Sequence, residues 1–373
     1  MERKGLAVIY DPHNLFQFVW YFCNQNSGKR WDALCLPNGQ MGEYMGEACE
    51  KASIFEQIYR YNISYENMKP IKKICIFLNM FLYAIIKKQE TMCYKIIEKY
   101  VNPDLYDEIV ILTDSGIVSG ACMGLAEYKK VVILEDGVSD TLQRHERFQW
   151  GDVLKTYHLQ GYILSKLGYA CPGHHYILKT SHNCIKYYSN SDIMPFKGYK
   201  EIHQLFDMAS IDQNQYNQIL KRIYPQLEEF SFEDYDAIIF TSPLDDFTDE
   251  CEKYIERVCD YLGKRYHGIM IKKHPRDRAE YNFNDCKRIC DINQTIPAEL
   301  LFPFLSNIDI YFMSYTTMVM YLKSYNYKVS YFYLNNLYEE SKKKNAAGEY
   351  YTEEKMEAFY HYWVGENSQK IVI

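Results

Sequence analysis

A histidine beside a proline follows an apolar run in the second half of the chain, at Lys273-His274-Pro275-Arg276. Proline fixes its own φ and lacks a backbone N–H, so it ends the strand and orients the preceding histidine. Histidine can donate a proton to a leaving group. Lys272, Lys273, Arg276 and Arg278 form the main basic cluster, which suits a phosphate. A solvated basic turn is the structural alternative.

Two acidic motifs follow predicted strands and can supply a general base. Glu135-Asp136-Gly137 directly follows the run Val131-Val132-Ile133-Leu134, so a carboxylate there can take a proton from an acceptor hydroxyl. Asp245 and Asp246 follow the apolar run that ends at Thr241, and they are the alternative candidates for the general base. A plain turn at Asp136-Gly137, or a cap of the next helix by the aspartates, explains each motif without chemistry.

Hydroxyl groups follow a third predicted strand, at Ser314-Tyr315-Thr316-Thr317. Hydroxyls and free N–H groups at a helix start bind phosphate, although Ser and Thr are also common helix caps. Glu299 lies in the first turn of a predicted short helix, where an acid favours the helix dipole. Its functional alternative is a hydrogen bond to ribose hydroxyls.

A metal site is the competing chemistry. Cys171, His174, His175, His182 and Cys184 gather in a short span, and these residue types bind zinc. Their spacing fits no standard zinc framework, so we predict no metal. The sequence also lacks a dinucleotide GxGxxG fingerprint, a Walker loop and a GxSxG elbow.

Composition narrows the function classes. The chain has 373 residues and a net charge of −7, which disfavours nucleic-acid binding. Its 12 cysteines are scattered, as in proteins of a reducing cytosol. We expect a cytoplasmic protein, because the start has no secretory apolar region. The longest apolar stretch, 74–86, is too short to span a bilayer.

Strand and helix patterns alternate along most of the chain. Predicted strands lie at 5–10, 108–113, 130–135, 237–241, 267–272, 308–313 and 328–333. Predicted helices follow residue 12 and lie at 70–100, 115–128, 249–262, 297–305, 316–325 and 353–364. Such alternation predicts parallel sheets covered by helices. Two such series, separated by a weakly patterned middle at 140–235, predict an α/β fold of two Rossmann-like domains facing across a cleft.

We place the first, acceptor-side domain at 1–205, with an irregular part at 140–205, and a linker at 206–235. The second, donor-binding domain covers 236–350. The last segment, 351–373, is expected to be a helix that packs back across the domains.

The order of these motifs resembles that of bacterial sialyltransferases, most closely the lipooligosaccharide and capsule group of glycosyltransferase family 52. That set, with the polysialyltransferases, carries an acidic-acidic-Gly motif, then His-Pro, then a hydroxyl pair some forty residues later. Here these look like Glu135-Asp136-Gly137, His274-Pro275 and Thr316-Thr317. Glu299 is similar to the family's ribose-binding acid. The opening strand followed by Asp11-Pro12-His13-Asn14 also resembles the family.

The resemblance implies a GT-B enzyme that transfers sialic acid from CMP-sialic acid with inversion and without a divalent metal. Glu135, Asp136, Asp245 or Asp246 would act as base and His274 as proton or hydrogen-bond donor. The donor would be held by the following residues: Lys273, Pro275, Arg276, Glu299, Ser314, Thr316 and Thr317. The acceptor would be a glycan, with galactose of a lipooligosaccharide or a capsule as the expectation. Peripheral contact with the inner membrane and a homodimer remain open.

Two alternatives remain beside this interpretation. A GT-B transferase that uses a UDP- or GDP-hexose fits the same two-domain pattern. A non-catalytic relative that binds glycans or nucleotides belongs to a different class, and the 37 tyrosines are compatible with a sugar-binding surface. Aromatic side chains more often form the core of a protein than its binding surfaces.

Overall fold

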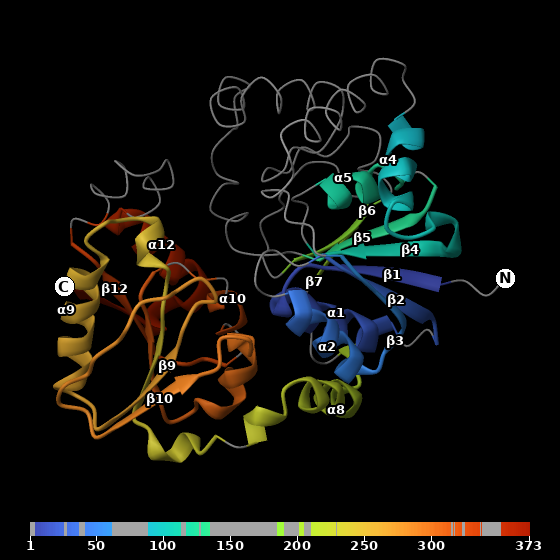
Figure 1. Ribbon diagram of the computed structural model, residues 1–373. Helices are drawn as coiled ribbons and strands as arrows, with labels where there is room; N and C mark the ends of the chain where they lie inside the picture. The colour runs from blue at the N-terminus through green and yellow to red at the C-terminus, as the bar shows by residue number, and fades with distance from the viewer. Residues whose placement is uncertain are drawn as a thin grey trace, which may run out of the picture. The chain divides into compact units, whose positions relative to one another are not determined.

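The computed structural model describes residues 4–25, 28–36, 42–61, 89–112, 117–126, 128–134, 185–189, 201–204, 210–228, 230–314, 316, 318–322, 325–335, 337 and 352–373. The chain forms two compact units, and it passes from the first to the second between Pro225 and Gln226. Each unit is a twisted sheet covered by helices (Figure 1).

The N-terminal unit contains a parallel sheet of seven strands in the order β3-β2-β1-β4-β5-β6-β7. The strands are β1 (Lys4–Ile9), β2 (Arg30–Cys35), β3 (Phe55–Arg60), β4 (Tyr106–Ile111), β5 (Lys130–Leu134), β6 (Ile185–Ser189) and β7 (Glu201–Gln204). The strand order reverses between β1 and β4. This is the doubly wound Rossmann order with one more strand at its end.

Two groups of helices cover this sheet. The helices are α1 (Pro12–Gln25), α2 (Gly42–Ala52), α4 (Gln89–Glu98), α5 (Ile117–Met123) and α8 (Gln213–Ile223). Helices α1, α2 and α8 pack together on one face, while α4 and α5 pack together on the other (Figure 1). Because crossovers between parallel strands are right-handed, the reversal of strand order places the helices of the two halves on opposite faces.

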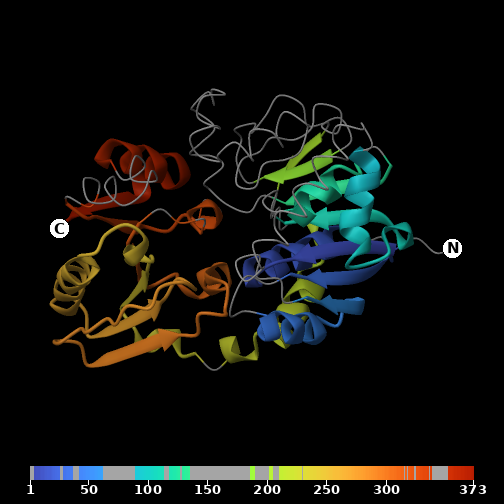
Figure 2. The same cartoon turned by 45° about the horizontal axis from the view of Figure 1, so that its top comes forward.

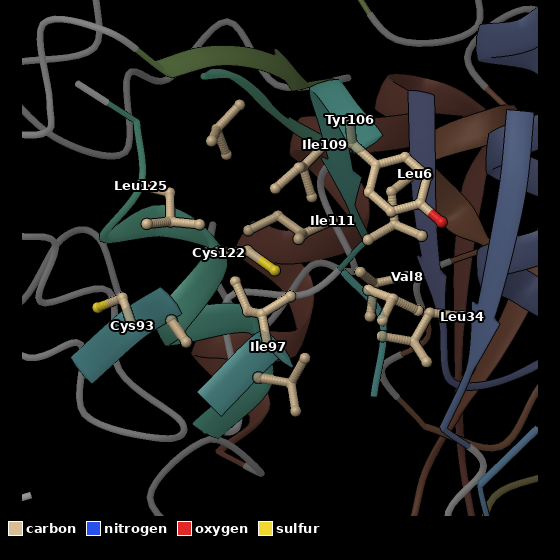
Figure 3. Packing of buried hydrophobic residues seen from close by; sticks show 14 of the residues in the cluster. Leu6, Val8, Leu34, Cys93, Ile97, Tyr106, Ile109, Ile111, Cys122 and Leu125 are labelled. Atoms are coloured by element: carbon tan, nitrogen blue, oxygen red, sulfur yellow. The ribbon is translucent and has the colours of Figure 1, made fainter. Parts of the chain in front are cut away.

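A cluster of apolar side chains fills the core between the sheet and helices α4 and α5. Leu6 of β1 and Ile111 of β4 face Ile97 of α4 and Cys122 of α5 (Figure 3). All four side chains have a relative exposure of 0%. Burial of a leucine or isoleucine contributes about 1.5–3 kcal/mol, so this layer fixes the helices on the sheet.

Charged side chains are buried near the amino ends of the same strands. The Glu108 carboxylate of β4 accepts a hydrogen bond from the Tyr21 hydroxyl at 2.6 Å. It also lies 2.6 Å from the Lys29 ammonium and 2.7 Å from that of Lys130. These cations lower the pKa of Glu108 against the opposing effect of burial, which is the largest single contribution. The carboxylate thus ties α1 to the start of β5.

The C-terminal unit repeats the Rossmann order with six parallel strands, β10-β9-β8-β11-β12-β13. The strands are β8 (Ala237–Phe240), β9 (Gly268–Lys272), β10 (Arg288–Ile292), β11 (Asp309–Phe312), β12 (Val329–Tyr333) and β13 (Ser368–Val372). The helices are α9 (Cys251–Gly263), the 3-10 helix η9 (Ala298–Phe304), α10 (Val319–Leu322) and α12 (Glu353–Val364). Helix α12 packs beside β12 and β13, near the red C-terminal end of the chain in Figure 2.

The predicted pair of Rossmann-like domains is confirmed, and several details differ from expectation. Residues 206–235 include α8, which packs on α1 and α2 of the N-terminal unit. Residues 351–373 contribute α12 and a sixth strand to the C-terminal unit. The expected helix at 297–305 is a 3-10 helix that contains Pro303, whose missing N–H disfavours α-helical bonding. Within the range of the expected helix at 316–325, the structure describes the short helix α10 (Val319–Leu322).

No helix within the described ranges is both long and apolar enough to cross a membrane. The apolar stretch at 74–86 lies outside those ranges.

Two leucine substitutions in the N-terminal unit test the position of its core. We expect Leu6→Ala to lower the free energy of unfolding by about 2–5 kcal/mol, because it leaves a cavity between the sheet and the helices. Leu105 is 43% exposed, so Leu105→Ala is the matched control, with an expected loss below about 1 kcal/mol. Urea unfolding measures both, and equal losses would contradict this core.

Candidate functional site

The candidate site lies at the carboxyl edge of the C-terminal sheet, where three neighbouring strands end. Phe240 of β8 pairs with Lys272 of β9 on one side and with Phe312 of β11 on the other. Thr241 and Met313, the residues after β8 and β11, therefore lie at the same edge. The strand order reverses between β8 and β11, and open α/β sheets bind ligands at such a reversal.

The His-Pro motif forms a tight turn directly after β9. The carbonyl oxygen of His274 accepts a hydrogen bond from the backbone N–H of Asp277 at 2.9 Å. Pro275 occupies the second position of this four-residue turn, where its fixed φ is favourable. The backbone N–H of His274 donates to Thr241 Oγ1 at 3.1 Å. This hydrogen bond therefore holds the turn against the end of β8. The His-Pro motif alone does not predict that contact.

The imidazole of His274 has a defined tautomer. Its Nδ1 accepts a hydrogen bond from the backbone N–H of Arg276 at 3.2 Å. Because a neutral imidazole has one donor and one acceptor nitrogen, the proton of the neutral ring lies on Nε2. The turn thus favours a ring that offers Nε2–H as a hydrogen-bond donor. His274 is half-buried, while Pro275 and Arg276 are exposed.

A buried carboxylate that the motif search did not single out supports this turn. Asp277 is 3% exposed, and its Oδ2 accepts hydrogen bonds from the Thr241 hydroxyl and, at 2.8 Å, from the Tyr281 hydroxyl. Its Oδ1 accepts from the backbone N–H of Ala279 at 3.0 Å. Burial, followed by the charge of Asp277, raises the pKa of Tyr281. The one sequence signal is the aspartate itself, because Asp side chains in turns commonly accept a hydrogen bond from the backbone N–H two residues later.

Lys272 and Glu299 bring a buried pair of charges to the same edge. The Lys272 ammonium donates to the carbonyl oxygens of Lys273 at 3.1 Å and Gln294 at 3.3 Å. Burial lowers its pKa to about 8, and the charge of Glu299 opposes that effect. Glu299 is itself only 8% exposed. The predicted ribose-binding acid therefore lies within electrostatic reach of the basic cluster.

The structure describes two residues of the hydroxyl motif, Ser314 and Thr316. Ser314 follows β11, is 2% exposed and accepts a hydrogen bond at its carbonyl oxygen from the Tyr360 hydroxyl at 2.6 Å. Thr316 Oγ1 accepts from the backbone N–H of Met318 at 3.4 Å, just before α10. Thr316 therefore makes the kind of contact that caps a helix, as the structural interpretation of this motif expects. Thr317 lies outside the described residues.

The candidate bases are less well defined. Glu135-Asp136-Gly137 lies outside the part of the chain that the structure describes. Asp245 is exposed and belongs with Asp246 to a 3-10 turn, η8 (Leu244–Asp246). The N-cap residue of α9 is Glu250, so neither aspartate occupies that position.

The zinc alternative falls on residues whose structure is not described, since the segment with Cys171, His174, His175, His182 and Cys184 lies between 135 and 184. Among the residues that are described, no group of three or more His, Cys, Asp or Glu side chains is arranged to hold a metal ion.

Comparison with solved structures identifies the architecture. The Arabidopsis thaliana protein UGT89C1, complexed with UDP-L-rhamnose, matches with a TM-score of 0.53 at 8% identity, over 100% of this chain and 86% of that chain. Neisseria meningitidis UDP-GlcNAc 2-epimerase gives 0.47 at 11% identity, over 88% and 82%. Acinetobacter baumannii MurG gives 0.44 at 9% identity, over 99% and 86%. No protein-family model and no curated protein matches the sequence. The fold is therefore GT-B, with two Rossmann-like domains.

The buried Lys272 predicts a pH dependence of stability. Its pKa is about 8 in the folded protein, below the ordinary 10.5, so the unfolded chain binds more protons between these values. The free energy of unfolding should therefore rise with pH in this window, by up to about 1.4 kcal/mol per unit. In the Lys272→Met variant, the free energy of unfolding should not show this rise with pH.

Lys264→Met is the matched control, because the Lys264 side chain is 65% exposed. Denaturant unfolding of the wild type and both variants at pH 7.5, 8.5, 9.5 and 10.5 measures the difference. Parallel pH curves for the wild type and Lys272→Met would contradict a buried ammonium.

Proposed function

We propose that this chain is a GT-B glycosyltransferase that transfers sialic acid with inversion from CMP-sialic acid to a terminal sugar of a bacterial surface glycan. The fold supports a nucleotide-sugar enzyme in general. The choice of CMP-sialic acid rests on the resemblance of the acidic-acidic-Gly, His-Pro and Thr-Thr motifs to those of bacterial sialyltransferases.

The observation that carries the proposal is the orientation of His274. Its Nδ1 accepts a hydrogen bond from the backbone N–H of Arg276, so in the neutral ring Nε2–H is the donor, and we propose that it serves the leaving phosphate. The ring stands at the end of β9, next to the strand reversal where α/β sheets bind ligands. Lys273 and Arg276 flank it with positive charge, which favours a phosphate over a neutral ligand.

The chemistry that follows is a single displacement. A carboxylate removes the proton of the acceptor hydroxyl, and the anomeric carbon develops oxocarbenium character as CMP departs. Glu135 and Asp136 are the first candidates for the base, and Asp245 and Asp246 are the second. His274 Nε2–H stabilises the negative charge that develops on the departing phosphate.

Other residues bind the donor in this proposal. Thr316 and Thr317 hold the phosphate, with Ser314 as a further hydroxyl, and Glu299 binds the ribose hydroxyls. Hydrogen-bond donors that are held in place before the reaction can replace a metal ion at the leaving group. We therefore propose a reaction independent of divalent ions.

The acceptor in this proposal is a terminal galactose of a lipooligosaccharide or of a capsular glycan. In this proposal the enzyme acts in the cytoplasm and contacts the inner membrane as a peripheral protein. A homodimer is compatible with the resemblance to bacterial sialyltransferases.

A UDP- or GDP-sugar donor is the second candidate. It is favoured by the same GT-B fold in UGT89C1, a protein solved with UDP-L-rhamnose. The identity of the bound nucleotide distinguishes the first candidate from this one.

Thermal denaturation with CMP, CDP, UDP and GDP tests the donor. A nucleotide at about 100 times its Kd stabilises the folded state by about 2.7 kcal/mol. We expect CMP to raise the melting temperature most, with and without EDTA. A larger rise with UDP or GDP would contradict the CMP assignment. Loss of the CMP effect in EDTA would contradict metal independence.

Substitution of His274 tests its role in turnover. We expect His274→Ala to lower kcat by a factor of ~10² or more, because the leaving phosphate loses its donor. His267 is exposed and lies at the opposite end of β9, so His267→Ala is the matched control. The assay measures CMP release from CMP-sialic acid with a galactoside acceptor. Near-wild-type kcat in His274→Ala would remove this residue from the mechanism.

A further inference from the structure

His274 is held at three points by groups from different parts of the chain. Its backbone N–H donates to Thr241 Oγ1 at 3.1 Å. Its carbonyl oxygen accepts from the Asp277 backbone N–H at 2.9 Å and from Gln294 Nε2 at 3.3 Å. Its ring Nδ1 accepts from the Arg276 N–H at 3.2 Å. Both backbone groups and one ring nitrogen are thus fixed, which leaves the ring little freedom to rotate.

The direction of the Thr241 hydroxyl is set by Asp277. A carboxylate oxygen can only accept, so the Thr241 proton points at Asp277 Oδ2. The Thr241 oxygen then has its lone pairs available for the N–H of His274. The Tyr281 hydroxyl donates to the same oxygen of Asp277 at 2.8 Å. One buried carboxylate therefore orders two hydroxyls, and one of these hydroxyls positions the His274 backbone.

Stability alone is a weak reason for this arrangement. Asp277 is 3% exposed and Thr241 is 5% exposed. Removal of a carboxylate from water is costly, and well-packed apolar side chains in place of a buried charge are often as stable or more so. A hydrogen-bonded network instead specifies one geometry. The network adjoins His274, whose ring can donate a hydrogen bond to a phosphate.

We propose that Asp277 and Thr241 are positioning residues: the Asp277 carboxylate orients the Thr241 hydroxyl, which holds the His274 turn so that Nε2–H faces the departing phosphate. The role at the phosphate rests on the proposed function. The control of the His274 ring by Asp277 and Thr241 does not, and it can be measured without substrate.

The ring itself provides the first test. In protein labelled with ¹⁵N-histidine, the ring nitrogen shifts distinguish the two tautomers, and the spectrum of His274→Ala assigns the His274 signals. We expect the neutral ring of the wild type to carry its proton on Nε2. A predominant Nδ1–H tautomer in the wild type would overturn the proposal, even if every variant failed to fold.

Three threonine variants give the second test. Thr241→Val keeps the shape of the side chain but removes the hydroxyl, whereas Thr241→Ser retains it. Thr248→Val is the matched control, because Thr248 is 3% exposed and its Oγ1 also accepts a backbone N–H, that of Glu250 at 3.0 Å. We expect Thr241→Val and Asp277→Asn to shift the His274 ring signals, and Thr241→Ser and Thr248→Val to leave them unchanged. Unchanged signals in Thr241→Val would overturn the proposal.

Kinetics then connects the ring to turnover. In the CMP-release assay we expect Thr241→Val to lower kcat by roughly 10-fold or more, with a smaller change in KM for the donor, because misplacement of a catalytic group acts on the transition state. Thr241→Ser should restore most of kcat. If the wild type releases no CMP while the ring signals respond as expected, the proposed function fails and the positioning of His274 stands.

Discussion

Parallel pairing of β8 with β9 and β11 is the constraint on which the candidate site depends. It brings the residues after three strands to one edge, although the strand ends at 240, 272 and 312 are at least 32 residues apart in sequence (272 − 240). Thr241, His274 and Ser314 come from three different connections and would be unrelated without this register. In an antiparallel sheet, successive strand ends would point to opposite edges, and no such grouping would arise.

The two sheets place their buried charges at opposite ends. In the N-terminal sheet, Glu108 and Asp32 are buried near the strand starts and are paired with lysines there. In the C-terminal sheet, Lys272 and Asp277 are buried at or just after a strand end. Charges at the start of strands bind elements together, while ligands approach the carboxyl ends. Among the residues that the structure describes, buried charge thus lies near the strand starts in one sheet and near the strand ends in the other.

The apolar strands were predictable because a strand covered on both faces must be apolar throughout. Residues 237–241, 308–313 and 328–333 correspond to β8, β11 and β12. In the C-terminal sheet, the two strands that were not predicted are more polar: β10 reads Arg-Ile-Cys-Asp-Ile at one edge, and β13 reads Ser-Gln-Lys-Ile-Val at the other. In the N-terminal sheet, β2, β3, β6 and β7 were not predicted either. An edge strand is covered less, so its sequence does not show the apolar run from which a strand is recognised.

For the site, the sequence by itself determined the turn. Proline after His274 fixes a strand end and places the histidine there, because the restriction on φ is local. Only the tertiary structure decided what holds that turn. Asp277 binds Thr241, which is 36 residues away, and Lys272 lies near Glu299 on another connection. Hydrogen bonds and buried charges depend on which surfaces meet after the sheet forms, and no local spacing along the chain contains that information.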